Sequence, residues 1–325
     1  IEAEETLLAR TRYNLGVVAL RQNQLDTAQT YLRAALNTQE QLLPDTPALA
    51  ATLQSLGELM YRRDNLEEAQ RLYQRALQIH EQRGEQSLEH AQTLLGLGTI
   101  ALRQQRWDDA RGFYARARQI AEQVAPESRE AGQASLGLGT VALESNQLQE
   151  AEQWLLKAAQ NPNLAPSEQI QVDHELGRLA LRRGDFERAQ ERFMRALERQ
   201  RALPDVPSNI ARTLYNLGVC ALERGEIAQA REFCRQALEI RQREEPQSVA
   251  VAHTLVALGF TEFYSRDFAQ ARRYLEQAMA IYDAANADPL ERSRALMGLG
   301  FVATELGASE DAETYLRAAL QAQLK

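Results

Sequence analysis

The densest run of side chains that could do acid–base chemistry is Asp173-His174-Glu175. A general acid and a general base must both reach the reacting group. The apolar periodicity around this run predicts a helix, and consecutive helix residues point about 100° apart. The three side chains therefore cannot converge on one atom. We interpret them as polar side chains on a surface or in a groove, and not as a catalytic centre.

Other patterns that could hold a metal or a phosphate are incomplete. His80 and His90 lack the spacing of metal ligands, and the chain has neither an HExxH nor a CxxC motif. The glycine pairs Gly96-x-Gly98 and Gly137-x-Gly139 fall inside predicted helices rather than after strands. We interpret them as packing glycines. The sequence therefore predicts no enzyme, no metal and no cofactor.

The amino-acid composition excludes some classes of binding partner. The formal net charge is -8, which argues against nucleic acid as a ligand because binding phosphates requires a surplus of clustered cations. Of the 37 basic residues 35 are arginine, so lysine chemistry is nearly excluded. No apolar run is long enough for a transmembrane helix, and no secretory signal precedes the first helix. The start at Ile1 suggests a fragment or a processed chain.

Cys220 and Cys234 are the only cysteines, and both fall on apolar positions of predicted helices. Two small buried thiols in a reducing compartment are the simplest interpretation, and a disulfide or redox pair is the alternative. A cytoplasmic location is expected on this basis.

The elements that must position any site come from an internal repeat. A Leu-Gly pair recurs eight times in the same register, with successive glycines 41 residues apart except for one interval of 38. Alanines stand twelve and nineteen residues after every one of these glycines. The eight glycines are Gly16, Gly57, Gly98, Gly139, Gly177, Gly218, Gly259 and Gly300.

Each repeat predicts two helices joined by a short polar turn. The first carries the glycine in its interior, where it costs about 1 kcal/mol against alanine. Retaining that glycine in every repeat predicts close approach by a neighbouring helix. The second has an apolar stripe, as at Ala69, Tyr73, Ala76 and Leu77. Prolines and glycines between repeats mark helix ends.

This arrangement of Leu-Gly, alanine, an aromatic or leucine, and a second alanine resembles the tetratricopeptide repeat. Its longer period is similar to the subclass found in kinesin light chains and in the sensor regions of bacterial STAND-type ATPases and transcription regulators. The chain departs from the family pattern at the tryptophan place, where none of the repeats has tryptophan, and at the tyrosine place, which is mostly alanine.

The resemblance implies that the first helices line a concave groove that binds a peptide. At the groove positions the middle repeats place basic and polar side chains that could cradle a carboxylate, and the last repeats place aromatic and apolar ones, with Phe263 beside them. Asn14 and Asn216 resemble asparagines that hold a peptide backbone in related repeats. The predicted groove residues are Tyr13, Asn14, His174, Arg178, Arg182, Arg212, Tyr215, Asn216, His253, Phe260, Tyr264, Met297 and Phe301.

The fold expected from these features is all-α, a right-handed α-solenoid of eight tetratricopeptide-like helix pairs in a single domain over residues 1–325. The expected repeats span about 5–43, 46–84, 87–125, 128–162, 167–203, 207–245, 248–285 and 289–325.

The function expected is non-catalytic recognition of a protein or peptide segment, acidic or with apolar anchors, within a bacterial-type signalling protein. Neither nucleic acid nor membrane is expected as a partner. The alternative is a structural module that associates with copies of itself through its terminal helices, where Leu316, Leu320 and Leu324 extend an apolar stripe.

Overall fold

A computed structural model describes residues 2–84, 86–203 and 207–324. Within these ranges the chain forms sixteen α-helices and no strand. In chain order they are α1 (Glu2–Arg21), α2 (Leu25–Leu42), α3 (Pro47–Arg62), α4 (Leu66–Arg83), α5 (Leu88–Arg103), α6 (Trp107–Val124), α7 (Arg129–Glu144), α8 (Leu148–Gln160), α9 (Pro166–Arg182), α10 (Phe186–Arg201), α11 (Pro207–Glu223), α12 (Ile227–Glu244), α13 (Val249–Tyr264), α14 (Phe268–Ala284), α15 (Pro289–Glu305) and α16 (Ser309–Gln323).

These helices divide into two compact units, residues 1–172 and residues 173–325, called unit 1 and unit 2 below. The division falls within α9. The single domain expected from the sequence stays a prediction. The predicted all-α repeat architecture is confirmed, since the sixteen helices correspond to eight pairs.

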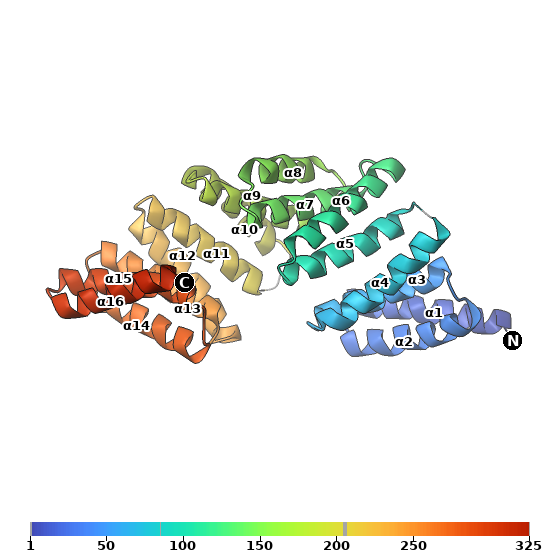
Figure 1. Ribbon diagram of the computed structural model, residues 1–325, viewed down its shortest axis with the longest axis horizontal. Coiled ribbons are helices and arrows are strands. Elements are labelled where there is room, and N and C mark those ends of the chain that lie inside the picture. Colours follow the sequence, from blue (N-terminus) through green and yellow to red (C-terminus); the bar gives the residue numbers. More distant parts are fainter. Residues whose placement is uncertain (1, 85, 204–206, 325) are drawn as a thin grey trace. The chain divides into compact units, whose positions relative to one another are not determined.

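Within a unit, each odd-numbered helix packs against the helix that follows it and against the next odd-numbered helix. In unit 1, α3 contacts α4 and α5, and in unit 2, α13 contacts α14 and α15. Figure 1 shows these pairs lying side by side, blue to green in unit 1 and yellow to red in unit 2. The odd-numbered helices therefore form a continuous row within each unit, and that row carries the residues predicted to bind.

The interior glycines make the close packing possible. A Cβ on Gly57 would lie 2.8 Å from the ring of Tyr73 in the same repeat, and a Cβ on Gly96 would lie 2.5 Å from that ring on its other side. The predicted packing role of the glycines is thus confirmed. In all eight repeats the side chain facing the glycine stands sixteen residues later, at Leu32, Tyr73, Tyr114, Leu155, Phe193, Cys234, Leu275 and Leu316.

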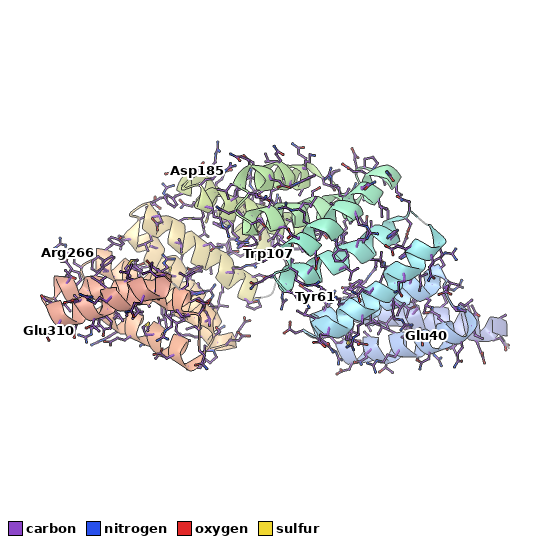
Figure 2. All side chains as sticks on the ribbon, in the orientation of Figure 1. Glu40, Tyr61, Trp107, Asp185, Arg266 and Glu310 are labelled. Atoms are coloured by element: carbon purple, nitrogen blue, oxygen red, sulfur yellow. The ribbon has the colours of Figure 1, made fainter. Side chains whose placement is uncertain are left out.

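The turn inside each pair is closed by a left-handed residue. Seven positions after each repeat glycine, φ lies between 57° and 75°, at Asn23, Asp64, Gln105, Asn146, Gly184, Gly225, Arg266 (labelled in Figure 2) and Gly307. A residue in this conformation commonly ends a helix because it turns the chain away while satisfying the last carbonyls. Asn65, Asp185 and Asp267 then cap the next helix by accepting a backbone N–H.

The core follows the alanine pattern. The alanines twelve and nineteen residues after each glycine are at most 7% exposed, so the two helices of a pair approach closely along their length. Larger apolar side chains are buried with them, Leu53 and Leu94 in unit 1 and Phe193 in unit 2 fully, and Tyr282 in unit 2 nearly so. Across the described ranges, no helix has the length and apolar character needed to cross a membrane.

Candidate functional site

The largest cluster of predicted binding residues surrounds a cavity of about 580 Å³ in unit 2. Phe260 and Tyr264 lie one turn apart on α13, and Met297 and Phe301 lie one turn apart on α15. Residues four apart share a helix face, so the two members of each pair lie together, and both pairs line the same cavity. The spacing in the sequence was enough to predict that these four side chains belong together.

Exposure within the cavity is graded. Phe260 is 8% exposed, Phe301 38% and Tyr264 60%. Phe263 supports the two exposed rings, with its centroid 5.6 Å from that of Tyr264 and 6.1 Å from that of Phe301. It also lies 5.7 Å from the ring of Phe268, at the start of α14. The cavity therefore has a buried base, and an open rim of aromatic rings held by their neighbours.

Several lining residues were not among the predicted ones. Leu222 and Ile227 flank the α11–α12 turn, and their position follows from the path of that turn rather than from the groove pattern. Glu223 and Arg294 stand at groove positions and bring a charge of each sign to the lining. The repeat spacing was the signal that could have identified these two.

The middle group of predicted residues forms an internal polar cluster. The His174 ring is 2% exposed, and its Nε2 lies 3.0 Å from Asn216 Nδ2. Arg178 donates to Glu175 at 2.8 Å. The predicted carboxylate cradle at Arg178 is therefore occupied by a carboxylate of the same helix.

Electrostatics in this cluster favour a charged glutamate and a neutral histidine. Burial alone would raise the pKa of Glu175, but the His174 ring and the charges of Arg178 and Arg212 outweigh it, and the pKa is lowered. Burial lowers the pKa of His174, with Arg212 and Arg178 adding to the effect against Glu175. Asn216 thus contacts a side chain of its own unit, whereas the sequence predicts a contact with peptide backbone.

Asp173-His174-Glu175, interpreted from the sequence as polar side chains on a surface or in a groove, are buried, since all three are at most 5% exposed. His174 and Glu175 lie close together, with Nδ1 3.6 Å from Oε1, but Asp173 points to another helix. Asp173 accepts from Arg192 at 3.1 Å and from Arg199 at 2.6 Å, both on α10. The sequence could not show this because both arginines belong to the second helix of the repeat, outside the groove pattern.

The remaining predicted residues of unit 2 lie nearby on the odd-numbered helices. Arg182 and Arg212 are exposed. Tyr215 is half-buried under Arg241, whose guanidinium carbon lies 4.9 Å from the ring centroid. The His253 ring is tilted against Tyr282 at 5.8 Å, and its Nε2 is 3.9 Å from Glu291 Oε1.

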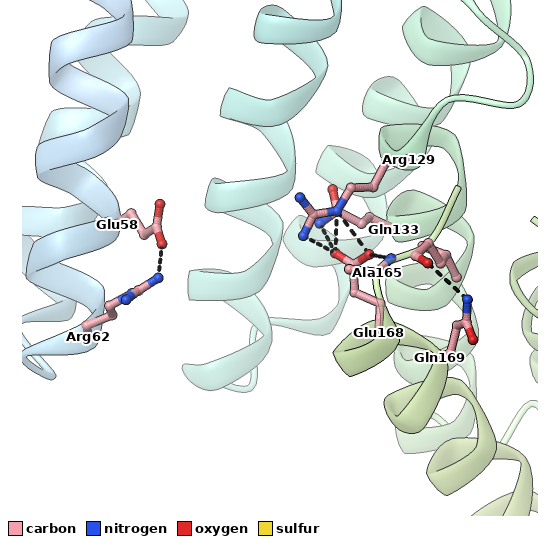
Figure 3. A network of polar contacts seen from close by, with 8 residues as sticks. Glu58, Arg62, Arg129, Gln133, Ala165, Glu168 and Gln169 are labelled. Carbon is pink, nitrogen blue, oxygen red and sulfur yellow. Dashed lines mark hydrogen bonds and ion pairs between the residues drawn. The ribbon is translucent and has the colours of Figure 1, made fainter. Parts of the chain in front are cut away.

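In unit 1 several polar side chains of the corresponding helices bond to each other. Tyr13 packs partly buried against the core, and Asn14 is exposed. Figure 3 shows Glu58 paired with Arg62, and Glu168 accepting from Arg129 and Gln133. Glu168 also accepts from the Ala165 N–H at 2.7 Å, which caps the start of α9.

The two thiols are not reactive groups. Cys220 and Cys234 are buried and unbonded, and burial raises the pKa of each to about 12. The predicted pair of small buried side chains is confirmed, with Cys234 packed against Gly218. Within the described ranges no group of three His, Cys, Asp or Glu side chains could hold a metal ion.

Fold and site together define a class, that of all-helical repeat proteins in which the odd-numbered helices form one face and a cavity opens on it. A sequence model of the tetratricopeptide repeat matches residues 7–82, 89–161, 168–243, 209–284 and 250–325. These matches cover most of the chain, and the chain belongs to the tetratricopeptide repeat family. No curated protein matches it.

Solved structures share the fold at low identity. The apo quorum sensor NprR from B. thuringiensis is 13% identical, with a TM-score of 0.72 over 98% of this chain and 88% of that one. A Rap protein complexed with competence and sporulation factor is 15% identical, with a TM-score of 0.64 over 97% of each chain. A STAND protein with a tetratricopeptide repeat sensor from Pyrococcus horikoshii is 12% identical, with a TM-score of 0.64 over 97% of this chain and 47% of that one.

Proposed function

We propose that this chain is a non-catalytic recognition module that binds a peptide or protein segment along the odd-numbered helices of unit 2. The observation that carries the proposal is the cavity formed by Phe260, Tyr264, Met297 and Phe301. Its open aromatic rim suits an apolar side chain of a partner, because a buried aromatic or aliphatic anchor is the usual centre of a recognition surface.

The expected energetics are adequate for such an anchor. Burying one leucine or phenylalanine side chain contributes about 1.5–3 kcal/mol. Phe260 is already buried and Phe263 supports the rim, so little ordering is needed when a ligand enters. The Rap structure with competence and sporulation factor and the quorum sensor NprR support a sensor role within a signalling protein.

The test is selection from a random dodecapeptide library, followed by affinity measurement on the selected peptides. Phe301→Ala and Met297→Ala are each expected to weaken binding at least tenfold, since each removes a wall of the cavity. Leu290→Ala is the matched control, because Leu290 lies on the same helix, is 60% exposed and does not line the cavity. Equal binding by all three variants would reject the cavity as the anchor site.

A second function, association between copies of the chain, is favoured by a different observation. Leu316, Leu320 and Leu324 at the last helix are 36%, 56% and 78% exposed. An apolar stripe of this kind can cover a copy of itself or another protein. Sedimentation velocity at increasing concentration tests this function, with Leu320→Glu expected to abolish any dimer. A single monomeric species throughout, with or without the substitution, would exclude it.

A further inference from the structure

Arg241 on α12 is a largely buried cation with neutral partners. One of its terminal nitrogens donates to the Ala250 carbonyl oxygen at 2.7 Å and to Thr254 Oγ at 2.5 Å. The guanidinium stacks over the Tyr215 ring at 4.9 Å. Burial lowers the pKa of Arg241, and the charge of Arg212 lowers it further.

No ion pair joins Arg241 to a carboxylate within the described ranges, which is unusual because buried charges are normally paired. Arg231 on the same helix shows the usual arrangement. Its guanidinium donates two hydrogen bonds to Glu262, at 2.8 and 2.7 Å. The difference leaves Arg241 with two bonds to neutral oxygens and with unused N–H groups in its planar fork.

Other cations surround the same place. Arg294 on α15 acts electrostatically on both Tyr215 and His253, as Arg241 does. Arg294 is exposed, and no hydrogen bond or ion pair to it occurs in the described part of the chain. Two acids face this group: Glu291, which lies 3.9 Å from His253, and Glu223, which lines the same cavity as Arg294. Positive charge therefore exceeds negative charge around Tyr215.

We propose that Arg241, stacked on the Tyr215 ring, and Arg294 together bind a carboxylate of the partner segment. The inference rests on the proposed function, because Arg294 also lines the apolar cavity and thus joins the two sites. The recognised segment carries an apolar anchor and, close to it in space, an acidic side chain or a free C-terminus. Arginine suits this role since its fork matches a carboxylate with two parallel hydrogen bonds.

Arg241 completes the site from outside the groove pattern. It belongs to an even-numbered helix, and its side chain passes between α11 and α13 to reach Tyr215 from one side and Ala250 and Thr254 from the other. Burial raises the pKa of Tyr215, so the phenol keeps its proton at neutral pH and can donate it to a carboxylate.

The experiment uses the full chain and two random dodecapeptide libraries, one with free C-termini and one with both ends joined to the carrier protein. The tightest peptide is then synthesised as the free acid, as the C-terminal amide, and with each Asp or Glu replaced by its amide. Removing the recognised carboxylate is expected to weaken binding by about tenfold or more, as for a charge-assisted hydrogen bond. Loss in the amide assigns a C-terminus, and loss in a side-chain variant assigns an acidic residue.

Arg294→Met and Arg241→Met are each expected to lower the affinity for the carboxylate-bearing peptide by about as much as removing its carboxylate does. The affinity for the peptide that lacks the carboxylate should not change. Arg243→Met is the matched control, since Arg243 lies two residues on in α12 and is an exposed partner of Glu239. Should Arg241→Met fail to fold, Arg294→Met still decides, because its side chain is exposed.

The inference would be overturned if the selected peptides contained no carboxylate. It would also be overturned if removing the carboxylate lowered the affinity of both arginine variants as much as that of the native chain. If those peptides still lose affinity with Phe301→Ala, the proposed function survives and only the carboxylate site fails. If neither library yields a binder, both are rejected.

Discussion

The two units have the same row of odd-numbered helices, but the side chains on that row differ between them. In unit 1 the polar groups of the row bond to each other. Gln54 donates to the Glu89 carbonyl at 2.6 Å, and Glu168 is held by Arg129 and Gln133 (Figure 3). In unit 2 the row surrounds a cavity with aromatic rings, and no ion pair joins Arg294 of this row to a carboxylate within the described residues. The comparison shows that the same repeat fold can carry internally bonded polar groups in one place and a cavity in another, and the proposed recognition site lies at the cavity.

The largest expected effect is a loss of unfolding free energy in one unit but not in the other. Tyr114→Ala removes a ring held between Gly98 and Gly137, and such a deletion costs about 3–5 kcal/mol. Both tryptophans, Trp107 and Trp154, belong to unit 1. Urea unfolding followed by tryptophan fluorescence should therefore shift to lower urea, while peptide affinity measured in the absence of urea is retained.

Phe193→Ala is the companion variant in unit 2, where Phe193 is fully buried. It should shift the transition seen by circular dichroism more than the one seen by fluorescence. Identical shifts with both probes in both variants would mean that the units unfold together, and the contrast between them would then rest on binding alone.

The next effect compares polar groups of the two rows. Glu168→Gln replaces a carboxylate that accepts hydrogen bonds from two side chains and a backbone N–H. The substitution should therefore lower the free energy of unfolding by about 1–3 kcal/mol. Arg294→Met should cost less than about 0.5 kcal/mol, as is usual for surface substitutions. Urea denaturation gives both values, and the reverse order would contradict the view that Glu168 is bonded within unit 1 while Arg294 lacks such bonds among the described residues.

A pH effect is expected from the histidines of unit 2. The folded-state pKa values of His174 and His253 are lowered, chiefly by burial, so the unfolded chain binds more protons below the ordinary histidine value of about 6.5. This contribution to stability is complete above that value and is lost as pH falls toward the folded pKa. Thermal unfolding at pH 7.5 and pH 5.5 should show the loss, and His174→Gln should reduce it. An unchanged pH dependence in that variant would exclude His174 as a source.

The smallest effect concerns a turn of unit 1. Gln105 adopts φ 58°, where a residue with a Cβ is disfavoured and glycine is not. Gln105→Gly should therefore raise stability by about 0.5–1 kcal/mol, seen as a later fluorescence transition. Gly184→Ala in unit 2, at φ 73°, is the converse substitution and should lower stability by a similar amount.

The repeat pattern was enough to predict the helix pairs, the glycine contacts and the meeting of four cavity residues, because fixed spacing on a helix determines which side chains share a face. It was not enough to place the proposed carboxylate site. Arg178 bonds to Glu175, a neighbour on its own helix, and this choice depends on rotamers. Arg241 reaches the row from an even-numbered helix, along a path that no spacing in the sequence encodes.

The tyrosine held between two glycines also restricts the order in which the repeats can follow one another. Tyr73 and Tyr114 each require a glycine two places before the repeat glycine of the next repeat, and find it at Gly96 and Gly137. The fifth repeat has Glu175 at that place. Moving the second repeat directly in front of the fifth would drive a phenol ring into that side chain. Shuffled or duplicated arrays of these repeats should therefore fold only where the ring and the glycine are inherited together.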